Sequence, residues 1–507
     1  MYMKKSASHW TVRISCITCL ICLITQTSIA ESLRAGAAKV DVTNYEAGPV
    51  NDPLHVRALV VQSDSETAVI ITVDAVAIGE IGPVKNDYLP TVRESLQTEL
   101  GIKTNRVIIN ASHCHGKVAP NVAELTVQAV KEAYENLAPV RVGVGTGHED
   151  RISENRRLIL KDGKEADVRH AYSLPADDDV AEVGPIDPQI GILKIDREDG
   201  RVLAVVYNFA MHPIQSVPGN ANTADVTGYS SKVIEDNLDE GTVALFVQGC
   251  GGDINPINYK DVDHPRHAEP LGNMLGLSTL LAVRKIKTEA SSKLNVIHDT
   301  LTLPRGDRSE RITQLEAEQR RLSGSIRGTS LNLKTFLPLV MKYNLSEEFP
   351  SYYSHRYLHD DALDRKDLRH LDAENRSNIE AYINNIQSME KLSRVNTNLR
   401  LLNKHQASLI ASGKRTIDVE LNALQVGKFK LLTFPGELTV RIGLNIKKDS
   451  GDPNTFVAGY TNGYIYYAPT AEQLLNVGGA QEDSDCILAP EWQKIFEEKA
   501  LEMLKAL

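Results

Sequence analysis

The stretch Arg106-Val-Ile-Ile-Asn-Ala-Ser-His-Cys-His-Gly116 joins an apolar, β-branched run to two histidines, His113 and His115. Such a run is typical of a buried strand. In an extended chain residues i and i+2 point the same way, so both imidazoles can reach one point at the end of that strand. Imidazole is a common zinc ligand, which makes the pair a candidate metal site. The alternative is one histidine that hydrogen-bonds within a loop and a second that is exposed.

Strands and helices alternate on both sides of this stretch. Short β-branched runs are expected as strands at 56–62, 68–74, 140–145, 189–195, 202–209 and 243–248. Amphipathic segments are expected as helices at 90–100, 123–137, 228–238 and 271–287. This order predicts an α/β fold with a layered mixed sheet that is covered by helices.

Residues 306–405 differ in composition from the sequence around them. They are rich in charge and poor in β-branched residues, and the segments 310–322 and 367–407 favour long surface helices. The strand pattern then returns, with strands expected at 419–425, 428–434 and near Phe456, and helices from Glu437 and at 491–504. We therefore predict one domain over 31–507, interrupted by a helical subdomain or lid at about 306–405. Solvated helices that only cover the sheet are the alternative.

Length and charge limit the class of protein. The chain has 507 residues, enough for a very large core, and a formal charge of −10. This charge argues against a general nucleic-acid-binding protein. A small-molecule or lipid substrate remains compatible with it, and no particular protein partner is indicated.

Residues 1–30 are predicted to be a cleavable signal peptide. Lys4 and Arg13 give a positive region around the start of the apolar segment 14–25, and a small residue precedes Glu31. A signal anchor is the alternative, but the apolar segment is short for a membrane span. The mature protein is therefore expected to be secreted or periplasmic, either soluble or in peripheral contact with a membrane.

The cysteines divide between the signal peptide and the mature chain. Cys16, Cys19 and Cys22 belong to the predicted signal peptide, so their metal-like spacing is disregarded. The remaining cysteines are odd in number and give no disulfide framework, although one bridge can form among them. They are Cys114, Cys250 and Cys486.

Further polar residues follow other predicted strands. His212 stands at the end of the run that begins at Val205, and a structural histidine is the alternative to a metal ligand there. Thr223 and Asp225 lie in a polar loop before a helix. They can cap that helix, or Thr223 can act as a hydroxyl nucleophile.

Two more segments carry acids at turns. Phe246-Val-Gln-Gly-Cys-Gly-Gly-Asp-Ile-Asn-Pro256 places Asp253 and Asn255 after a Gly-rich loop, where they can orient metal ligands by hydrogen bonds or cap a tight turn. Glu437 stands at a strand-to-helix junction, as a ligand or as an acid favoured by the helix dipole. The aromatic segment that ends near Tyr467 is expected mainly in the core.

In order and content these segments resemble the neutral, non-lysosomal ceramidase family. The resemblance covers most of residues 33–470 outside the predicted insertion. It implies an α/β catalytic domain that holds one Zn²⁺ through His113, His212, Glu437 and Tyr467. The segments that carry it are Asn110-Ala-Ser-His-Cys-His, Asn208-Phe-Ala-Met-His-Pro, Thr223-Ala-Asp with Gly228-Tyr229, Phe246-Val-Gln-Gly-Cys-Gly-Gly-Asp, Pro435-Gly-Glu and Asn462-Gly-Tyr-Ile-Tyr-Tyr.

The resemblance also implies catalytic roles. It places His115 and Arg156 in the active site, where either can donate a hydrogen bond to a developing oxyanion. Thr223, close to Asp225, stands where the family has a proposed serine nucleophile. Water activated by the zinc is the alternative attacking group. Lys117 stands where the family pattern has a small residue.

The sequence as a whole predicts an exported, zinc-dependent hydrolase of an amide or ester bond. An N-acyl sphingoid lipid is the first substrate class to consider. The alternatives are a hydrolase of another cell-envelope or glycan-linked substrate, and a non-catalytic zinc- or ligand-binding module on the same scaffold. Within the insertion, Phe336-Leu-Pro-Leu-Val-Met341 is the candidate lipid-facing surface, with the insertion's own small core as the alternative.

Overall fold

The computed structural model describes residues 32–168, 174–175, 177–257, 259, 263–350, 353–475 and 479–507. The predicted signal peptide at 1–30, with its three cysteines, lies outside the described residues. A helix needs about 20 consecutive apolar residues to cross a bilayer. Within the described ranges no helix offers such a segment.

The body of the protein contains two stacked sheets. The first has eight strands in the order β12-β11-β10-β5-β1-β2-β3-β4. Most neighbours run antiparallel, but β3 pairs with β4, and β11 with β12, in parallel. Three of the strands, β4, β11 and β12, are buried along their whole length, as their apolar sequences predict. The strands are β1 (Arg34–Asp41), β2 (His55–Gln62), β3 (Thr67–Val73), β4 (Val107–Ala111), β5 (Ala138–His148), β10 (Gln189–Arg197), β11 (Val202–Phe209) and β12 (Val243–Gln248).

The second sheet has four strands in the order β14-β15-β16-β18. Its inner face packs on the inner face of the first sheet, and Leu and Val side chains of both sheets form one core there. Phe456 of β18 covers Gly191 of β10 so closely that a Cβ atom on Gly191 would lie 2.2 Å from the ring. The strands are β14 (Leu294–Pro304), β15 (Thr416–Val426), β16 (Phe429–Thr433) and β18 (Thr455–Ala458). The sequence prediction missed β14, whose partly exposed positions carry polar residues such as His298 and Asp299.

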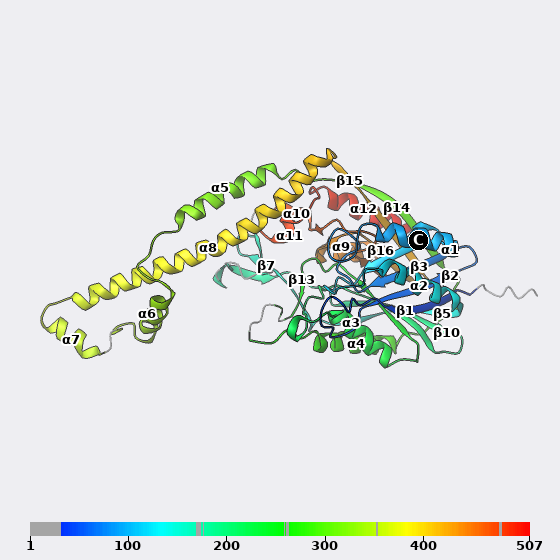
Figure 1. Cartoon of the computed structure of the whole chain (residues 1–507), viewed down its shortest axis with the longest axis horizontal. Helices are drawn as coiled ribbons and strands as arrows, with labels where there is room; N and C mark the ends of the chain where they lie inside the picture. Colours follow the sequence, from blue (N-terminus) through cyan, green and yellow to red (C-terminus); the bar gives the residue numbers. More distant parts are fainter. Residues whose placement is uncertain are drawn as a thin grey trace, which may run out of the picture.

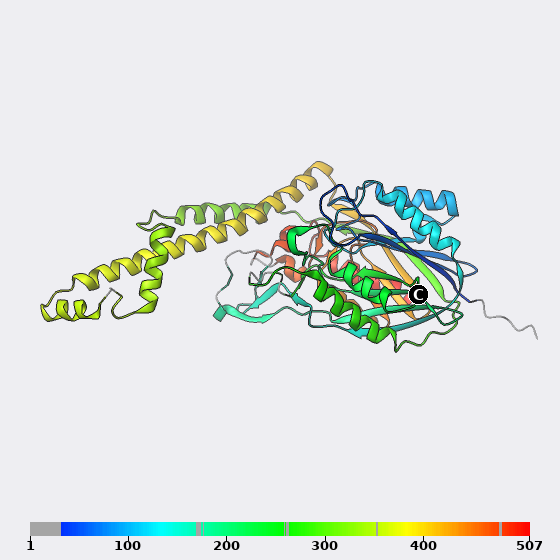
Figure 2. The ribbon, with the colours of Figure 1, turned by 60° about the horizontal axis from the view of Figure 1, so that its bottom comes forward.

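Helices cover the outer face of each sheet, which gives four layers (Figure 1, Figure 2). On the first sheet lie α1 (Tyr88–Leu100), α2 (Val122–Glu135), α3 (Asp225–Asp236) and α4 (Ala268–Val283). On the second lie α9 (Val440–Ser450) and α12 (Trp492–Ala506). These layers confirm the predicted α/β fold and add a second sheet to it.

The insertion is a helical arm between two strands that pair with each other. β14 and β15 are antiparallel neighbours from the pair Leu294–Val426 to the pair Pro304–Thr416. The arm, residues 305–415, therefore leaves and re-enters the second sheet at one point, and it projects away from the body (Figure 1). Its helices are α5 (Ser309–Ser325), α6 (Leu333–Leu345), α7 (Ser354–Ala362) and α8 (Asp367–Ser412).

Short elements complete the body. They are β6 (Ser153–Asn155), β7 (Arg157–Leu160), β8 (Glu165–Asp167), β9 (Val180–Val183), β13 (Ile254–Pro256), β17 (Glu437–Leu438), β19 (Tyr467–Ala468), α10 (Ala471–Leu475) and α11 (Gln481–Ser484). The helix expected from Glu437 begins at Val440 instead, because Glu437 pairs with Tyr467 as part of a short parallel ladder.

Candidate metal centre and its pocket

The ends of parallel strands from both sheets meet at one edge of the body. β4, β11 and β12 of the first sheet end there, as do β16 and β18 of the second. Asn110 of β4 holds these ends together: its side chain donates to the carbonyl of Gly459 at 2.8 Å and accepts from the amide of Gln248 at 2.8 Å. Ligand sites of open α/β sheets lie beyond the carboxyl ends of strands. The candidate site is found at this edge.

His113 follows β4 and is buried, with its ring fixed by the backbone. Its amide donates to the carbonyl of Ala75 at 2.9 Å, and Nδ1 lies 2.6 Å from the carbonyl oxygen of Val76. Nε2 consequently lies 3.6 Å from Oε2 of Glu437. The residue has a φ of 68°, so the chain is not extended here. The prediction that an extended backbone points His113 and His115 the same way is therefore wrong.

His212 follows β11 and is held in the same way. Its amide donates to the carbonyl of Ile254 at 2.9 Å, and Nδ1 lies 2.5 Å from the carbonyl oxygen of Gly251. Its Nε2 lies 3.0 Å from Oε2 of Glu437. Burial, together with the nearby charge of Arg156, lowers the pKa of His212 to about 3, so the ring is neutral at ordinary pH.

The glycine-rich loop after β12 brings the Glu437 segment close to His212. A Cβ atom on Gly252 would lie 2.6 Å from the carbonyl oxygen of Glu437. Asp253 accepts from the amide of Val440 at 2.8 Å and so binds the first residue of α9. The loop therefore packs backbone against backbone beneath the ligands. Asp253 positions the segment that carries Glu437, which combines the two roles considered from the sequence.

Glu437 is buried and accepts hydrogen bonds from two tyrosines that sequence reasoning assigned to the core. Tyr464 donates to Oε1 at 2.5 Å and Tyr460 donates to Oε2 at 3.2 Å. Burial raises the pKa of Glu437, and the hydrogen bond from Tyr464 lowers it. A buried carboxylate that stays charged requires a positive charge beside it.

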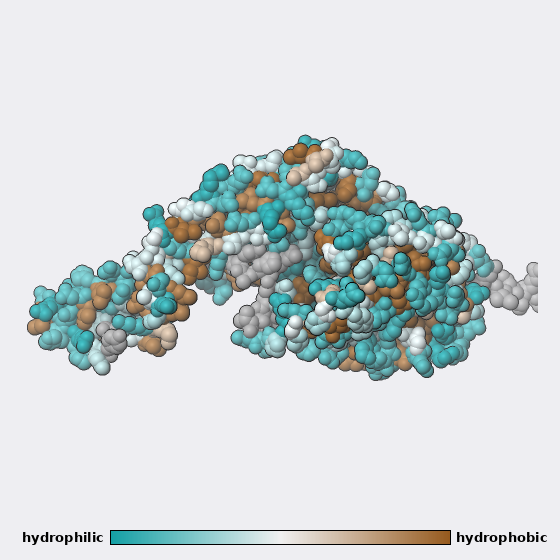
Figure 3. All heavy atoms as spheres, in the orientation of Figure 1, coloured by the Kyte–Doolittle hydropathy of each residue, from teal (hydrophilic) through white to brown (hydrophobic). Residues whose placement is uncertain are grey.

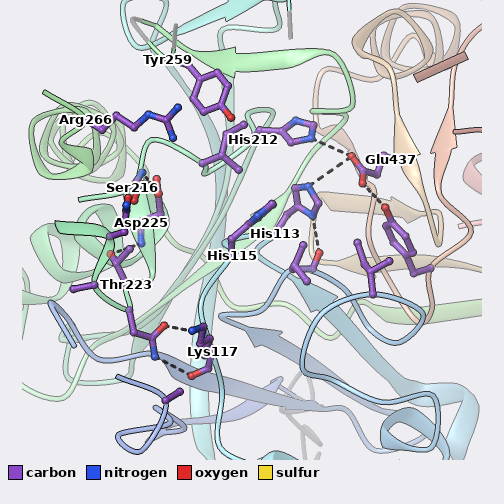
Figure 4. A pocket seen from close by; sticks show the side chains of 18 of the residues that line it. His113, His115, Lys117, His212, Ser216, Thr223, Asp225, Tyr259, Arg266 and Glu437 are labelled. Carbon is purple, nitrogen blue, oxygen red and sulfur yellow. Dashed lines mark hydrogen bonds and ion pairs between the residues drawn. The ribbon is translucent and has the colours of Figure 1, made fainter. Parts of the chain in front are cut away.

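His113, His212 and Glu437 form a ligand set that fits a metal ion. Their ligand atoms lie within 4.8 Å of one another (Figure 4). A backbone carbonyl only accepts hydrogen bonds, so Nδ1 of each neutral ring carries the hydrogen and the lone pair of Nε2 faces the carboxylate. Acceptor atoms that converge in a buried place are satisfied by a cation between them. The group can therefore bind a metal.

Tyr467 lies beside this group. It pairs in register with Glu437 between β19 and β17. Its hydroxyl lies 3.4 Å from Nε2 of His212, and the two rings are stacked with centroids 6.3 Å apart. The phenol oxygen is thus placed next to the ligand atoms, as the family resemblance implies for a fourth ligand.

Arg156 lies behind Tyr467 and does not line the pocket. One terminal nitrogen lies 3.3 Å from the Tyr467 hydroxyl and the other donates to Oδ1 of Asn255 at 3.1 Å. Its Nε lies 2.7 Å from Oε1 of Glu482. The structure therefore gives Arg156 and Asn255 a place in a buried network that holds Tyr467, away from the position expected for an oxyanion donor.

The metal group opens into a pocket of about 580 Å³, a volume within the range of small-molecule sites. Backbone strain is concentrated around this pocket. Residues in sparsely populated backbone regions gather at functional sites because the surrounding structure must hold them there. The residues with positive φ in or beside the site are His113, Ser216, Asn220, Asp225, Tyr460, Asn462 and Tyr466.

His115 and Thr223 both line this pocket. His115 is exposed, and its ring centroid lies 5.6 Å from that of His113. The Thr223 hydroxyl donates to the carboxylate of Asp52 and accepts from the amide of Asp225 at 2.9 Å. Thr223 thus faces the cavity and also binds the first residue of α3, and its role as a nucleophile stays a prediction. Asp52 has no local signal in the sequence, since its partner lies far along the chain.

Asp225 lines the pocket from the start of α3 and is buried. Its carboxylate accepts from the amides of Ser216 at 2.6 Å and Val226 at 2.8 Å. Burial raises the pKa of Asp225 to about 6 in spite of these bonds. Asp225 therefore fastens the loop at Ser216 to the helix and shapes the pocket wall.

The three cysteines that the structure describes do not form a bridge. Cys114, Cys250 and Cys486 are free and buried. Cys250 packs against Gly443 of α9, where a Cβ atom would lie 2.6 Å from the sulfur. These thiols serve as small apolar side chains of the core.

Comparisons with known proteins agree with the fold. No protein-family model and no curated protein sequence matches the chain. A solved neutral ceramidase from Pseudomonas aeruginosa matches with a TM-score of 0.59 and 16% identity, over 94% of this chain and 74% of that one. A ceramidase complexed with C2 matches with a TM-score of 0.60 and 16% identity, over 94% and 75% of the two chains. The chain therefore has a ceramidase-like fold, with a His-His-Glu group that can bind a metal.

Proposed function

We propose that this protein is an exported, zinc-dependent hydrolase that cleaves an amide bond, or an ester bond of similar shape. One observation carries the proposal: His113, His212 and Glu437 converge beside Tyr467 in an open pocket, on a fold shared with neutral ceramidase. Nitrogen and carboxylate ligands in this number suit zinc, with room left for a substrate oxygen or water.

In this proposal zinc is held by His113, His212, Glu437 and Tyr467. When bound there, zinc polarises an acyl carbonyl and lowers the pKa of water. The carbonyl oxygens of Val76 and Gly251 keep both imidazoles in the tautomer that a metal requires. Tyr460 and Tyr464 orient the carboxylate.

The side chains of the pocket supply the other needs of hydrolysis. In this proposal His115 donates a hydrogen bond to the developing oxyanion. Its exposure and its position next to His113 support that role. Thr223 offers a hydroxyl whose hydrogen is held by Asp52. That contact favours Thr223 as a nucleophile or as a group that positions substrate, and water is the alternative attacking group.

Metal analysis combined with a substrate panel tests the proposal. The purified protein is expected to contain about one zinc per chain and to hydrolyse fluorogenic N-acyl substrates, with short-chain N-acyl sphingoid compounds and O-acyl esters in the same panel. Glu437→Gln is expected to lose both metal and activity. Glu240→Gln, at an exposed turn after α3, is the matched control. Zinc without turnover on any substrate would favour the non-catalytic binding module instead.

Thr223→Ala separates the two attacking groups. If the hydroxyl attacks, turnover is abolished while zinc content stays unchanged. Retained turnover assigns the attack to water. Asp52→Asn is the companion variant, because it keeps the shape of the acid and removes its charge.

A sequencing experiment tests export. The predicted signal peptide should be absent from the exported protein, whose N-terminus is then expected at Glu31. A retained N-terminus would indicate the signal anchor.

A further inference from the structure

Three cationic side chains line the pocket that contains the metal group: Lys117, Arg266 and Lys404. They come from distant parts of the chain, namely the loop after β4, the segment before α4 and the base of the arm. All three are exposed, and Figure 4 shows Lys117 and Arg266 on the wall that faces the metal group. The sequence motifs of the metal group do not account for any of them.

The acids of the same pocket form no ion pair with these cations. Glu437 is bound by the two ligand histidines and by tyrosines, and Asp225 is bound by backbone amides. Asp485 lies 2.7 Å from Nε2 of His405. None of the three cations forms an ion pair with any residue in the described part of the chain. The three acids equal the three cations in number, but no ion pair joins them, so the exposed ammonium and guanidinium groups can contact a ligand.

Aromatic rings hold two of the cations at the pocket mouth. Nζ of Lys404 lies 4.3 Å from the ring centroid of Tyr466, and the guanidinium of Arg266 lies 4.9 Å from that of Tyr259. His405, the neighbour of Lys404, packs on the same Tyr466 ring with centroids 4.7 Å apart. Because cation–π contacts restrict these flexible side chains, their charge is directed to the pocket.

The apolar part of the pocket wall is about as extensive as the polar part. It combines aliphatic side chains with tyrosine rings, namely Ala47, Pro49, Val76, Ile81, Ile214, Ala221, Tyr259, Tyr464, Tyr466 and Tyr467. The apolar run Phe336–Met341, expected as a lipid-facing surface, belongs to α6 at the far end of the arm and does not line the pocket (Figure 1).

We propose that the pocket recognises a ligand with an anionic group, a carboxylate or a phosphate, and that the substrate of the hydrolase carries this group close to the bond that is cleaved. The statement that the ligand is a substrate rests on the proposed function. The charge recognition itself rests on Lys117, Arg266 and Lys404. Lysine and arginine side chains form charge-assisted hydrogen bonds with carboxylates and phosphates.

Binding of matched fluorescent probes tests the inference without relying on turnover. The probes are dansylglycine, which is anionic, its neutral amide, and the phosphate monoester of dansylethanolamine. The anionic probes are expected to bind about tenfold more tightly than the amide, as for a charge-assisted hydrogen bond. This preference should fall as sodium chloride rises from 50 to 500 mM, because salt screens exposed charges. The carboxylate and phosphate arms show which anion fits better.

Variants locate the effect. Arg266→Gln and Lys404→Met are each expected to reduce the preference for the anionic probe about fivefold or more, with zinc content unchanged. Lys103→Met removes the same charge at the opposite end of β4 and is expected to leave the preference intact. If both pocket variants keep the full preference while Glu437→Gln abolishes it, the metal alone captures the anion and the inference is overturned. Equal binding of anionic and neutral probes overturns it as well.

Hydrolysis separates this inference from the proposed function. We expect N-octanoylaspartate to be cleaved with a higher kcat/KM than N-octanoylasparagine amide, and the ratio of the two to fall in Arg266→Gln and Lys404→Met. Cleavage of both compounds at equal rates keeps the hydrolase and rejects the anionic substrate. Cleavage of neither, with the probe results as expected, rejects the hydrolase and keeps the anion-binding pocket.

Discussion

The body and the arm differ in how much of their apolar surface is buried. In the body, strands such as β11 and β12 are buried along their whole length between packed layers. In the arm, the buried residues of α8 all lie from Val395 to Leu409, close to the body. Farther out, Leu337, Met341 and Leu345 of α6 are 53%, 64% and 83% exposed. Figure 3 shows such apolar patches scattered over the polar surface of the arm. The body is stabilised by contacts between layers, whereas the outer arm buries few side chains, such as Tyr343 and Tyr357, which both donate to Asp372.

The base of the arm belongs with the body rather than with the outer arm. α5 and α8 share a small core there, and Lys404 and His405 of α8 reach the pocket mouth. The core consists of Leu315, Leu322, Val395, Leu399 and Leu402. The boundary between the two regions therefore lies along α8, whose buried residues begin at Val395.

The largest difference is expected from a matched pair of truncations. Phe456→Ala empties a fully buried site between the two sheets, which should lower the free energy of unfolding by about 3–5 kcal/mol. Phe336→Ala removes a partly buried ring that contacts Tyr382 in the arm, at 4.5 Å between centroids, and should cost less than about 1 kcal/mol. Urea denaturation followed by near-UV circular dichroism measures both. Equal losses would show that the arm and the body unfold as one unit.

Removal of metal is expected to weaken the body alone. A ligand that binds only the folded state, at 100 to 1,000 times its Kd, stabilises that state by about 2.7–4.1 kcal/mol. Dialysis against a chelator should lower the free energy of unfolding by about this amount. His113→Asn should unfold at the same urea concentration with or without chelator, since it lacks a ligand. A chelator effect of equal size in His113→Asn would place the metal elsewhere.

Lowering the pH is expected to destabilise the protein through Glu420. This residue of β15, in the second sheet, binds α1, which covers the first sheet. Both of its oxygens accept from Arg93 of α1, at 2.6 and 2.7 Å. Although burial opposes it, this pairing holds the pKa of Glu420 well below its ordinary value of 4.5. A lowered folded-state pKa stabilises the protein above the unfolded-state pKa, and this stabilisation is lost as the pH falls through the folded-state value.

Glu420→Gln is therefore expected to cost about 1–2 kcal/mol at pH 7. The difference from the wild type should shrink progressively below pH 4.5. Urea titrations at a series of pH values measure this. A difference that stays constant down to pH 2 would mean that lost packing, rather than lost charge, explains the cost.

The smallest effect is expected from excision of the outer arm. Arg327, just after α5, lies against Asn385 of α8. The side chain of Asn385 donates to the carbonyl of Arg327 at 2.7 Å and accepts from its amide at 3.1 Å. Replacing residues 328–384 by a short glycine–serine turn should change the free energy of unfolding of the body by about 0.5 kcal/mol or less. Zinc content and pocket activity should be kept. Loss of either would show that the outer arm supports the pocket.

The sequence predicts the body well because its strands are defined by local apolar runs. The segment 202–209 is a strand with the expected bounds, and Phe209 leads to His212 at the site. β14 escaped prediction because half-buried strands at the rim of a sheet carry polar residues, as at His298. Its existence follows from pairing with β15, which no local pattern reveals.

The candidate site is only partly predictable for a similar reason. Three ligand residues follow strands that the sequence predicts, so they can be identified as candidate metal ligands. They are His113, His212 and Glu437. Tyr460 and Tyr464 cannot be identified in this way, because an aromatic residue in an apolar segment is usually packed in a core and their partner becomes visible only in the fold. The cationic wall of the pocket likewise depends on residues brought together from three distant segments.

The position of the arm has a consequence for how the chain reaches its native state. Pro304 and Thr416 are partners across the root of the arm, so their pairing closes a loop that contains the whole insertion. Each doubling of loop length adds about 0.6 kcal/mol of closure entropy, and long-range pairing slows folding. Arg305 donates to the Ser412 hydroxyl at 2.7 Å, and the root of α5 packs on α8. A helical hairpin that formed at this root before the strands paired would shorten the effective loop and lower the kinetic barrier to joining β14 and β15.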